Sequence, residues 1–152
     1  NIIQFELEGR RVLDLFAGTG QLGLEALSRG AEHCTFVDQR REAAALVREN
    51  VKLCGFTDRS RVAQEDALSF LSVCREKFDV VFLDPPYQSG LLEKSLKLLT
   101  QFDILREHGI IVCESGMEWA IPTPEPPYEA GREYRYGQIK LSLCRRTGSV
   151  IQ

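Results

Sequence analysis

The sequence predicts an α/β fold in which a mostly parallel, doubly wound sheet carries helices on both faces. Three observations point to this fold. Short apolar runs alternate with helical patterns, the run VLDLF is apolar at nearly every position, and a glycine-rich loop follows that run. Strands that alternate with helices form parallel sheets, and a strand covered on both faces has no polar side. The chain of 152 residues is expected to form one domain, residues 1–152.

Five strands and four helices are expected before the pattern changes after Cys113. The strands are expected near Arg11–Phe16, His33–Val37, Arg61–Ala63, Phe78–Leu83 and Gly109–Cys113. The helices are expected near Leu22–Arg29, Arg41–Leu53, Ala67–Arg75 and Leu91–Gln101. The second helix is the clearest, because one face with helical spacing collects Ala43, Leu46, Val47, Asn50, Val51 and Cys54. Gly55 then stands where a left-handed C-terminal cap belongs.

The end of the chain has a different pattern. The segment IPTPEPP, residues 121–127, is rich in proline and has neither helical nor strand periodicity, which indicates a loop. Two extended runs, Glu133–Tyr136 and Gln138–Leu143, are joined at Gly137 and predict an antiparallel hairpin at the edge of the sheet.

Composition excludes several classes of protein. Hydrophobic residues make up 43% and charged residues 27%, which is typical of a globular protein in water. No apolar run approaches the roughly 20 residues of a membrane span, so no membrane partner is expected. The five cysteines include no CxxC pair, which argues against a disulfide framework or a zinc site and favours the cytoplasm. The cysteines are expected to be small core residues.

The glycine loop after the first strand matches a dinucleotide-binding pattern. Gly18, Gly20 and Gly23 satisfy GxGxxG, and Asp38 closes the second strand, where an acid accepts hydrogen bonds from ribose hydroxyls. Glycine allows the backbone to turn and to approach a ligand closely. A nicotinamide-dependent oxidoreductase is therefore a real alternative.

Asp14 favours a different ligand. Its carboxylate would repel a pyrophosphate beside the glycine loop and would attract a cationic group. S-adenosylmethionine has an ammonium and a sulfonium in place of phosphates, and Asp14 could attract this positive end. Asp38 could accept hydrogen bonds from its ribose, and Asp66 could accept one from its adenine amine. Asp66 could instead only cap the third helix, and Asp38 could only form a turn. Acids at the ends of three successive strands nevertheless line the crevice where doubly wound sheets bind ligands.

The stretch VVFLDPPY ends a buried strand with an acid, two prolines and an aromatic ring. The fourth strand of such a sheet lies beside the first, so Asp84 would sit next to the methyl donor. Asp84 and the Pro85 carbonyl could hold the two hydrogens of an exocyclic base amine and direct its lone pair, while the prolines keep both acceptors fixed. Tyr87 offers a flat face to a base that leaves its stack. Glu114 could face the same crevice, and the sequence assigns it no role.

The segments DLFAGTGQLGLEALSRGA, VFLDPPY and YGQIKLSL resemble the RsmD-type family, bacterial methyltransferases of guanine N2 in small-subunit ribosomal RNA. The similarity runs from about Arg11 to Arg145. It implies a Rossmann-like seven-stranded sheet, S-adenosylmethionine as methyl donor with S-adenosylhomocysteine as product, and no metal. The implied cofactor residues are Asp14, Phe16, Ala17, Gly18, Thr19, Gly20, Asp38, Asp66 and Ala67. The implied catalytic residues are Asp84, Pro85, Pro86 and Tyr87.

The resemblance also sets expectations about partners. It implies a cytoplasmic monomer that acts on ribosomal RNA within the small ribosomal subunit. Members of the family usually begin with a basic extension that helps to hold RNA, and residues 1–5 look like the end of its helix. We therefore expect this chain to bind RNA weakly.

Alternatives to this interpretation remain open at the level of sequence. A DNA amino-methyltransferase acting on adenine N6 or cytosine N4 would use the same DPPY chemistry. Such enzymes usually carry an added recognition region, for which 152 residues leave no room. A binding module that has lost catalysis is disfavoured by the intact Asp84-Pro85-Pro86-Tyr87 loop.

Overall fold

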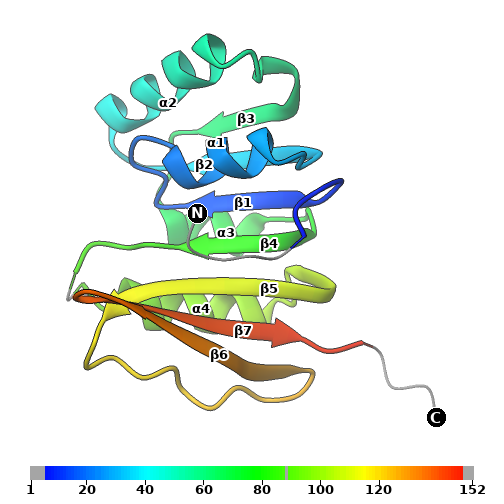
Figure 1. Ribbon diagram of the computed structural model, residues 1–152, viewed down its shortest axis with the longest axis vertical. Helices are drawn as coiled ribbons and strands as arrows, with labels where there is room; N and C mark the ends of the chain where they lie inside the picture. The colour runs from blue at the N-terminus through cyan, green and yellow to red at the C-terminus, as the bar shows by residue number, and fades with distance from the viewer. Residues whose placement is uncertain (1–5, 88, 149–152) are drawn as a thin grey trace.

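A computed structural model describes residues 6–87 and 89–148 as a single sheet flanked by helices (Figure 1). The strands are β1 (Arg11–Leu15), β2 (His33–Val37), β3 (Ser60–Ala63), β4 (Phe78–Leu83), β5 (Leu105–Gly116), β6 (Tyr128–Tyr136) and β7 (Ile139–Arg146). The helices are α1 (Gln21–Ser28), α2 (Arg41–Leu53), α3 (Ala67–Val73) and α4 (Leu91–Gln101), with a 3₁₀ turn, η1, at Thr57–Arg59. The helix end expected at residues 1–5 lies outside the described residues.

The seven strands follow the order β3-β2-β1-β4-β5-β7-β6. The first five pair in parallel, and β7 pairs antiparallel with both β5 and β6. The chain builds the sheet outward from β1 in one direction and then returns to place β4 on the other side of β1. The crevice between β1 and β4 is therefore the topological switch point, where doubly wound sheets bind ligands. The predicted fold and the terminal hairpin are confirmed.

The strands alternate their side chains between two apolar layers. Phe36 and Phe82 belong to the layer under α1 and α2, whereas Leu13 and Leu83 belong to the layer under α3 and α4. In Figure 1, α1 lies in front of the sheet and α3 and α4 lie behind it. Phe36 and Leu13 are fully buried, and burial of one such side chain stabilises a fold by about 1.5–3 kcal/mol. This double covering explains why the central strands lack a polar face.

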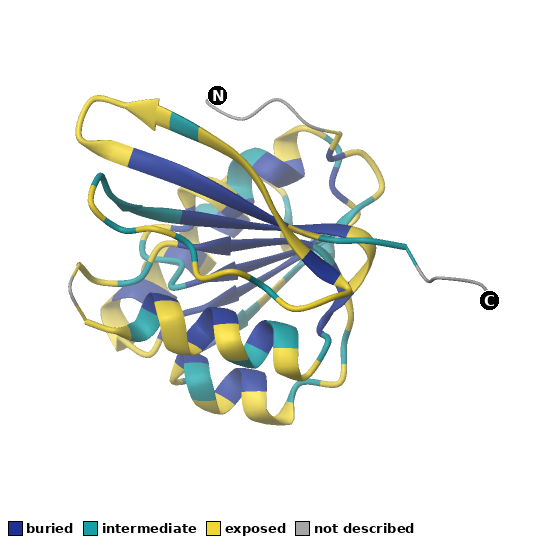
Figure 2. Cartoon of the chain, turned by 90° about the horizontal axis from the view of Figure 1, so that it is seen from below, coloured by how far each residue is buried: buried dark blue, intermediate teal, exposed yellow. Residues whose placement is uncertain are grey.

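The hairpin of β6 and β7 is less covered than the centre of the sheet. Figure 2 shows buried strands running through the middle of the molecule and mostly exposed residues along β6. Only Tyr128 is buried in β6, whereas residues 140–144 of β7 are buried. Gly137 turns the chain between the two strands with φ 59°. The loop predicted at residues 121–127 contains neither helix nor strand.

The C-terminus of α2 is closed as the sequence predicts. Gly55 has φ 76°, and its N–H donates to the Lys52 carbonyl while the Phe56 N–H donates to Val51. This pair of bonds is the Schellman arrangement, which satisfies carbonyl groups that the helix leaves unpaired. The predicted buried face of α2 is partly wrong, because Leu46 and Cys54 are exposed.

The buried face of α2 instead consists of Ala43, Ala44, Val47 and Val51. The neighbouring positions Ala43 and Ala44 both turn toward the sheet, so the stripe is rotated away from Leu46. The expectation that the cysteines are core residues holds for Cys34, Cys113 and Cys144 but fails for Cys54.

The fifth strand is longer than predicted at both ends. In its first half the pairing with β4 is irregular, because the register shifts between Phe78 and Val80. In the same half, His108 has φ 65°. Its last residues, Glu114 to Gly116, pair with β7. Local periodicity cannot reveal these positions as strand, because their partners are far away in the sequence. The third helix is shorter than predicted and ends at Val73.

Candidate functional site

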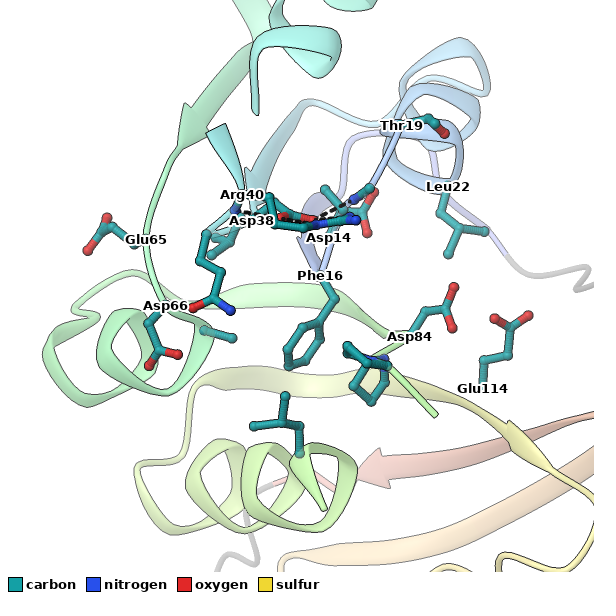
Figure 3. A pocket seen from close by; sticks show the side chains of 18 of the residues that line it. Asp14, Phe16, Thr19, Leu22, Asp38, Arg40, Glu65, Asp66, Asp84 and Glu114 are labelled. Carbon is teal, nitrogen blue, oxygen red and sulfur yellow. Dashed lines mark hydrogen bonds and ion pairs between the residues drawn. The ribbon is translucent and has the colours of Figure 1, made fainter. Parts of the chain in front are cut away.

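A cavity of about 580 Å³ opens at the C-terminal ends of the parallel strands (Figure 3). It is lined by Asp14, Phe16, Ala17, Gly18, Thr19, Gln21, Leu22, Val37, Asp38, Gln39, Arg40, Glu65, Asp66, Ala67, Asp84, Pro85, Pro86, Leu91 and Glu114. These residues lie at or just after the ends of five neighbouring strands, β1 to β5, and meet at the switch point between β1 and β4. Most of the sequence-predicted site residues therefore lie around one cavity.

The register of the sheet explains why the acids meet. One row of paired residues crosses the sheet on the side of α1 and α2. The row consists of Phe36, Asp14, Phe82 and Val112. Asp38, Asp84 and Glu114 each follow a member of this row by two residues: Phe36, Phe82 and Val112, respectively. Since side chains two apart in a strand share a face, these three acids and Asp14 face the same side of the cavity.

Asp14 is held deep in the fold, with 1% of its surface exposed. Its Oδ2 accepts a hydrogen bond of 3.1 Å from the backbone N–H of Gly23 in α1. Burial raises the pKa of Asp14 to about 8; the Gly23 bond opposes that rise, and the charges of Asp84 and Asp38 add to it. A buried carboxyl group with few compensating donors is stabilised by a cation placed beside it.

Asp38 is buried but well supplied with donors. Its carboxylate accepts hydrogen bonds from Gly18 N–H at 3.0 Å and from Arg40 N–H at 2.9 Å. The Arg40 guanidinium adds two more bonds of 3.2 Å, one to each oxygen, as Figure 3 shows. Burial raises the pKa of Asp38, but the bonds from Arg40 and Gly18 outweigh it and hold the pKa below its ordinary range. Asp38 is thus a fixed, ionised acceptor at the rim of the cavity.

Asp66 caps α3, as one interpretation of the sequence suggested. Its Oδ2 accepts from Ser69 N–H at 3.0 Å and from the Ser69 hydroxyl at 3.1 Å. Both bonds end on the same oxygen, and Asp66 also lines the cavity together with Ala67. The capping role therefore leaves the proposed contact with a ligand sterically open.

The three glycines of the loop have different structural roles. Gly18 lines the cavity with φ 60°, which favours glycine. Gly20 does not line the cavity; it is the N-cap of α1 with φ 82°, and a Cβ there would lie 3.2 Å from Val47. A Cβ on Gly23 would lie 2.3 Å from the Phe36 ring, so this glycine allows α1 to pack on β2. The Asn50 side chain anchors the loop by donating a hydrogen bond of 3.0 Å to the Thr19 carbonyl.

The residues of the DPPY loop do not all line the cavity. Asp84, Pro85 and Pro86 line the cavity, and Tyr87 does not. Tyr87 is 66% exposed, and its hydroxyl donates 2.5 Å to Glu118. Its ring lies against Gly116 of β5, where an added Cβ would come within 2.9 Å. Tyr87 therefore stands outside the cavity, on the side of β5.

Glu114 is the site residue that the sequence left without a role. Leu83 pairs with Cys113 in the parallel β4–β5 ladder, so the following residues, Asp84 and Glu114, emerge side by side. Their carboxyl groups lie next to each other in Figure 3. The hydrogen bond to Asp84, together with burial and the charge of Asp84, raises the pKa of Glu114 to about 8. The signal in the sequence was an acid at the end of a fifth parallel strand.

The charge of the cavity decides which ligands fit. Its acidic side chains are Asp14, Asp38, Glu65, Asp66, Asp84 and Glu114, against the single cation of Arg40. Such a lining repels the two phosphates of a dinucleotide and attracts a ligand with positive charge. The buried, poorly compensated Asp14 is the observation that fits the cationic end of S-adenosylmethionine. Within residues 6–87 and 89–148, no group of three or more His, Cys, Asp or Glu side chains could hold a metal ion.

The strand order, the antiparallel last pair and the acid-lined cavity define the class of Rossmann-like methyltransferase folds. The profile of the family described as "Conserved hypothetical protein 95" matches residues 1–145, and the chain belongs to this family.

Individual relatives confirm the resemblance to RsmD-type proteins. The chain is 37% identical over 151 residues to "Putative rRNA methyltransferase YlbH" of Bacillus subtilis, covering 97% of this chain and 82% of the relative. It is 36% identical over 134 residues to "Ribosomal RNA small subunit methyltransferase D" of Escherichia coli, covering 88% and 67%. The solved structure titled "Putative methyltransferase yhhF from Escherichia coli" has a TM-score of 0.86 at 34% identity, covering 93% and 78%.

Proposed function

We propose that this protein is an S-adenosylmethionine-dependent methyltransferase that modifies the exocyclic N2 amine of a guanine in small-subunit ribosomal RNA. The observation that carries the proposal is the position of Asp84 and Pro85 in the same cavity as Asp14 and Asp38. Acceptors for an amine and acceptors for a cationic cofactor thus share one cavity. The names of the relatives, which are ribosomal RNA methyltransferases, support RNA as the substrate.

When bound, S-adenosylmethionine supplies a methyl group activated by a sulfonium. Asp14 would pair with the positively charged end, because a cation beside it favours the carboxylate over the protonated form that burial otherwise stabilises. Asp38 would accept hydrogen bonds from the ribose hydroxyls, and Asp66 with Ala67 would border the adenine. Phe16, Gly18 and Thr19 line the cavity between these acids.

The amine of the target base needs two fixed acceptors. Its lone pair is delocalised into the ring, so the nitrogen is a poor nucleophile. Asp84 and the Pro85 carbonyl would each accept a hydrogen bond from one N–H of the amine and direct the lone pair into the cavity. The prolines restrict the backbone at this point, so little reorganisation is required when the substrate binds. Tyr87, which lies outside the cavity, would contact the RNA next to the target.

Further expectations belong to the same proposal. The substrate would be presented within the small ribosomal subunit, in the cytoplasm, to a monomeric enzyme. No helix among the described residues has the length and apolar character that crossing a membrane requires. The choice of guanine N2 rests on the resemblance to RsmD-type proteins, because the DPPY chemistry would serve adenine and cytosine amines as well.

Methyl transfer from labelled S-adenosylmethionine tests the proposal. Unmethylated small ribosomal subunits, free small-subunit RNA and DNA are offered in parallel, and the products are digested to nucleosides. Label in N2-methylguanosine from the ribosomal samples is the expected result. Label in a DNA base would keep the mechanism and overturn the substrate, and label in no sample would overturn the function.

A further inference from the structure

The pair formed by Asp84 and Glu114 provides more than the amine clamp requires. The clamp uses one carboxylate and one backbone carbonyl. Glu114 adds a second carboxyl group directly beside Asp84, because the parallel β4–β5 register places the two residues after Leu83 and Cys113 next to each other. Both groups line the cavity. A second carboxyl at this point costs electrostatic repulsion, which a structural role does not require.

The bases differ in the group beside their exocyclic amine. In guanine the N2 amine lies between two ring nitrogens: N3 is an acceptor, whereas N1, on the Watson–Crick edge, carries a hydrogen and is a donor. In adenine and cytosine the ring nitrogen next to the amine is an acceptor. A carboxylate accepts only, whereas a protonated carboxyl can donate. Enzymes that take a base out of its stack recognise it by hydrogen bonds to its Watson–Crick edge, which includes the amine and this ring nitrogen.

We infer that Glu114 is a specificity-determining residue that accepts a hydrogen bond from N1–H of guanine while Asp84 and Pro85 hold the adjacent N2 amine. This inference rests on the proposed function and names the residue that selects guanine. Glu114 binds guanine as the carboxylate, so a protonated Glu114 releases its proton to solvent when guanine binds.

The surroundings of Glu114 support a group that changes its protonation. Asp84 faces it from β4, and its partner in β7 is the apolar Leu141. Lys140, the next charged group of β7, is buried and pairs with Glu133 at 3.8 Å. The hydrogen bond to Asp84 and burial bring the pKa of Glu114 to about 8, so the proton leaves within the range in which enzymes work.

The test uses a base that differs from guanine at this edge. 2-Aminopurine keeps the 2-amine but has an unprotonated N1, which is an acceptor. After the methylated nucleotide has been mapped, two small-subunit RNAs are assembled into subunits, one with guanine and one with 2-aminopurine at that position. Transfer is measured with the wild-type protein, with Glu114→Gln and with Glu129→Gln, an exposed glutamate of β6 that serves as a matched control.

The wild-type protein and the control are expected to prefer guanine over 2-aminopurine by roughly 10- to 100-fold in kcat/KM. Glu114→Gln is expected to lose most of this preference, because an amide can donate to N1 of 2-aminopurine as well as accept from guanine. S-adenosylhomocysteine should bind the variant and the wild-type protein equally, which shows that the cavity is intact.

The pH dependence separates recognition from a structural role. For the wild-type protein the preference for guanine should rise between pH 6.5 and 8.5 as Glu114 loses its proton, with the midpoint near the pKa of about 8. Asp14 also titrates near this range, but it affects both substrates equally and cancels from the ratio. For Glu114→Gln the ratio should not change with pH.

An unchanged preference in Glu114→Gln would show that Glu114 does not read N1, even where guanine is methylated normally. A wild-type protein that methylates adenine or cytosine but not guanine would instead overturn the proposed function itself, and the inference with it. The two failures are therefore distinguishable in one set of reactions.

Discussion

The backbone N–H of Gly23 donates a hydrogen bond of 3.1 Å to Oδ2 of Asp14, which ties the first turn of α1 to β1. The bond fixes a buried carboxyl group at the floor of the cavity, between a strand and the helix that covers it. Gly23 can approach so closely because it has no Cβ, which would meet the Phe36 ring at 2.3 Å. The absence of a side chain at Gly23 therefore serves both the packing of α1 on the sheet and the hydrogen bond that holds Asp14.

Replacing Gly23 by alanine is expected to destabilise the protein by about 1–3 kcal/mol, because the new methyl group overpacks the contact between α1 and β2. Urea unfolding measures the change in the free energy of unfolding. Ser28→Ala in the exposed end of the same helix is the control and should stay within about 0.5 kcal/mol of the wild-type value. Equal stability of the two variants would show that α1 can move away without cost.

Asp14→Asn is expected to stabilise the protein at alkaline pH and to weaken the binding of S-adenosylmethionine. The unfolded chain ionises Asp14 near its ordinary pKa of 3.8, whereas the folded state keeps the proton up to a pKa of about 8. The folded state therefore binds more protons in this interval, and its stability falls as pH rises from about 4 to about 8.

Unfolding at a series of pH values isolates this effect. The variant should gain on the wild-type protein steadily across that interval, by at least about 1 kcal/mol at pH 8, and the difference should be constant at higher pH. Calorimetry with S-adenosylmethionine gives the affinity in parallel. A difference in stability that does not depend on pH would show that Asp14 is ionised throughout.

Asp38→Ala is expected to weaken cofactor binding by about 1.5–3 kcal/mol through the loss of charge-assisted hydrogen bonds. Arg40→Ala is the informative comparison. The Arg40 guanidinium occupies both oxygens of Asp38, the same acceptors that ribose hydroxyls would use. Its removal should therefore cost much less affinity than the loss of Asp38. Titration with S-adenosylhomocysteine measures both variants, and equal losses would show that Arg40 itself contacts the ligand.

Asp84→Ala is expected to lower the rate of methyl transfer by about 10²-fold or more and to leave S-adenosylhomocysteine binding nearly unchanged. The amine would lose one of its two acceptors, while the cofactor acids remain. Asp58→Asn, on the exposed η1 turn, is the control. Transfer at the normal rate would contradict the clamp.

The same variant has a second, independent consequence. Without Asp84, the pKa of Glu114 should fall from about 8 toward its ordinary value of 4.5, because the hydrogen bond and the charge that raise it are gone. Carbon-13 NMR of the glutamate carboxyl groups follows this titration. An unchanged pKa would mean that burial alone holds the proton on Glu114.

The sequence predicted the order of the central elements because their signals are local. The run VLDLF, the glycine loop and the capped second helix each contain their own periodicity and end signals. The predicted strand Phe78–Leu83 coincides with β4, because a proline pair ends it. The errors fell where a distant partner decides: β5 extends through Glu114 because β7 pairs with it, and Leu46 is exposed because α2 is rotated on the sheet.

The site shows the same division. The residues Asp14, Asp38, Asp66 and Asp84 could be found from the sequence, because each lies within or just after a predicted strand, and the strands themselves have local signals. Gly20 was assigned to the ligand, but it does not line the cavity, and a Cβ there would lie 3.2 Å from Val47; Tyr87 also lies outside the cavity. Only contacts across elements distinguish these roles, and no spacing in one segment encodes them.

By itself, the sequence determined which strands end in an acid and that the chain must turn sharply after β1 and β4, since hydrophobic periodicity, glycine and proline act over a few residues. The tertiary structure decided which acids meet. Parallel pairing of β4 with β5 brings Glu114 beside Asp84 from thirty residues away, and burial beneath α1 gives Asp14 its raised pKa. Register and desolvation are properties of the assembled sheet, so the arrangement of the acids and their protonation states are set only once the chain has folded.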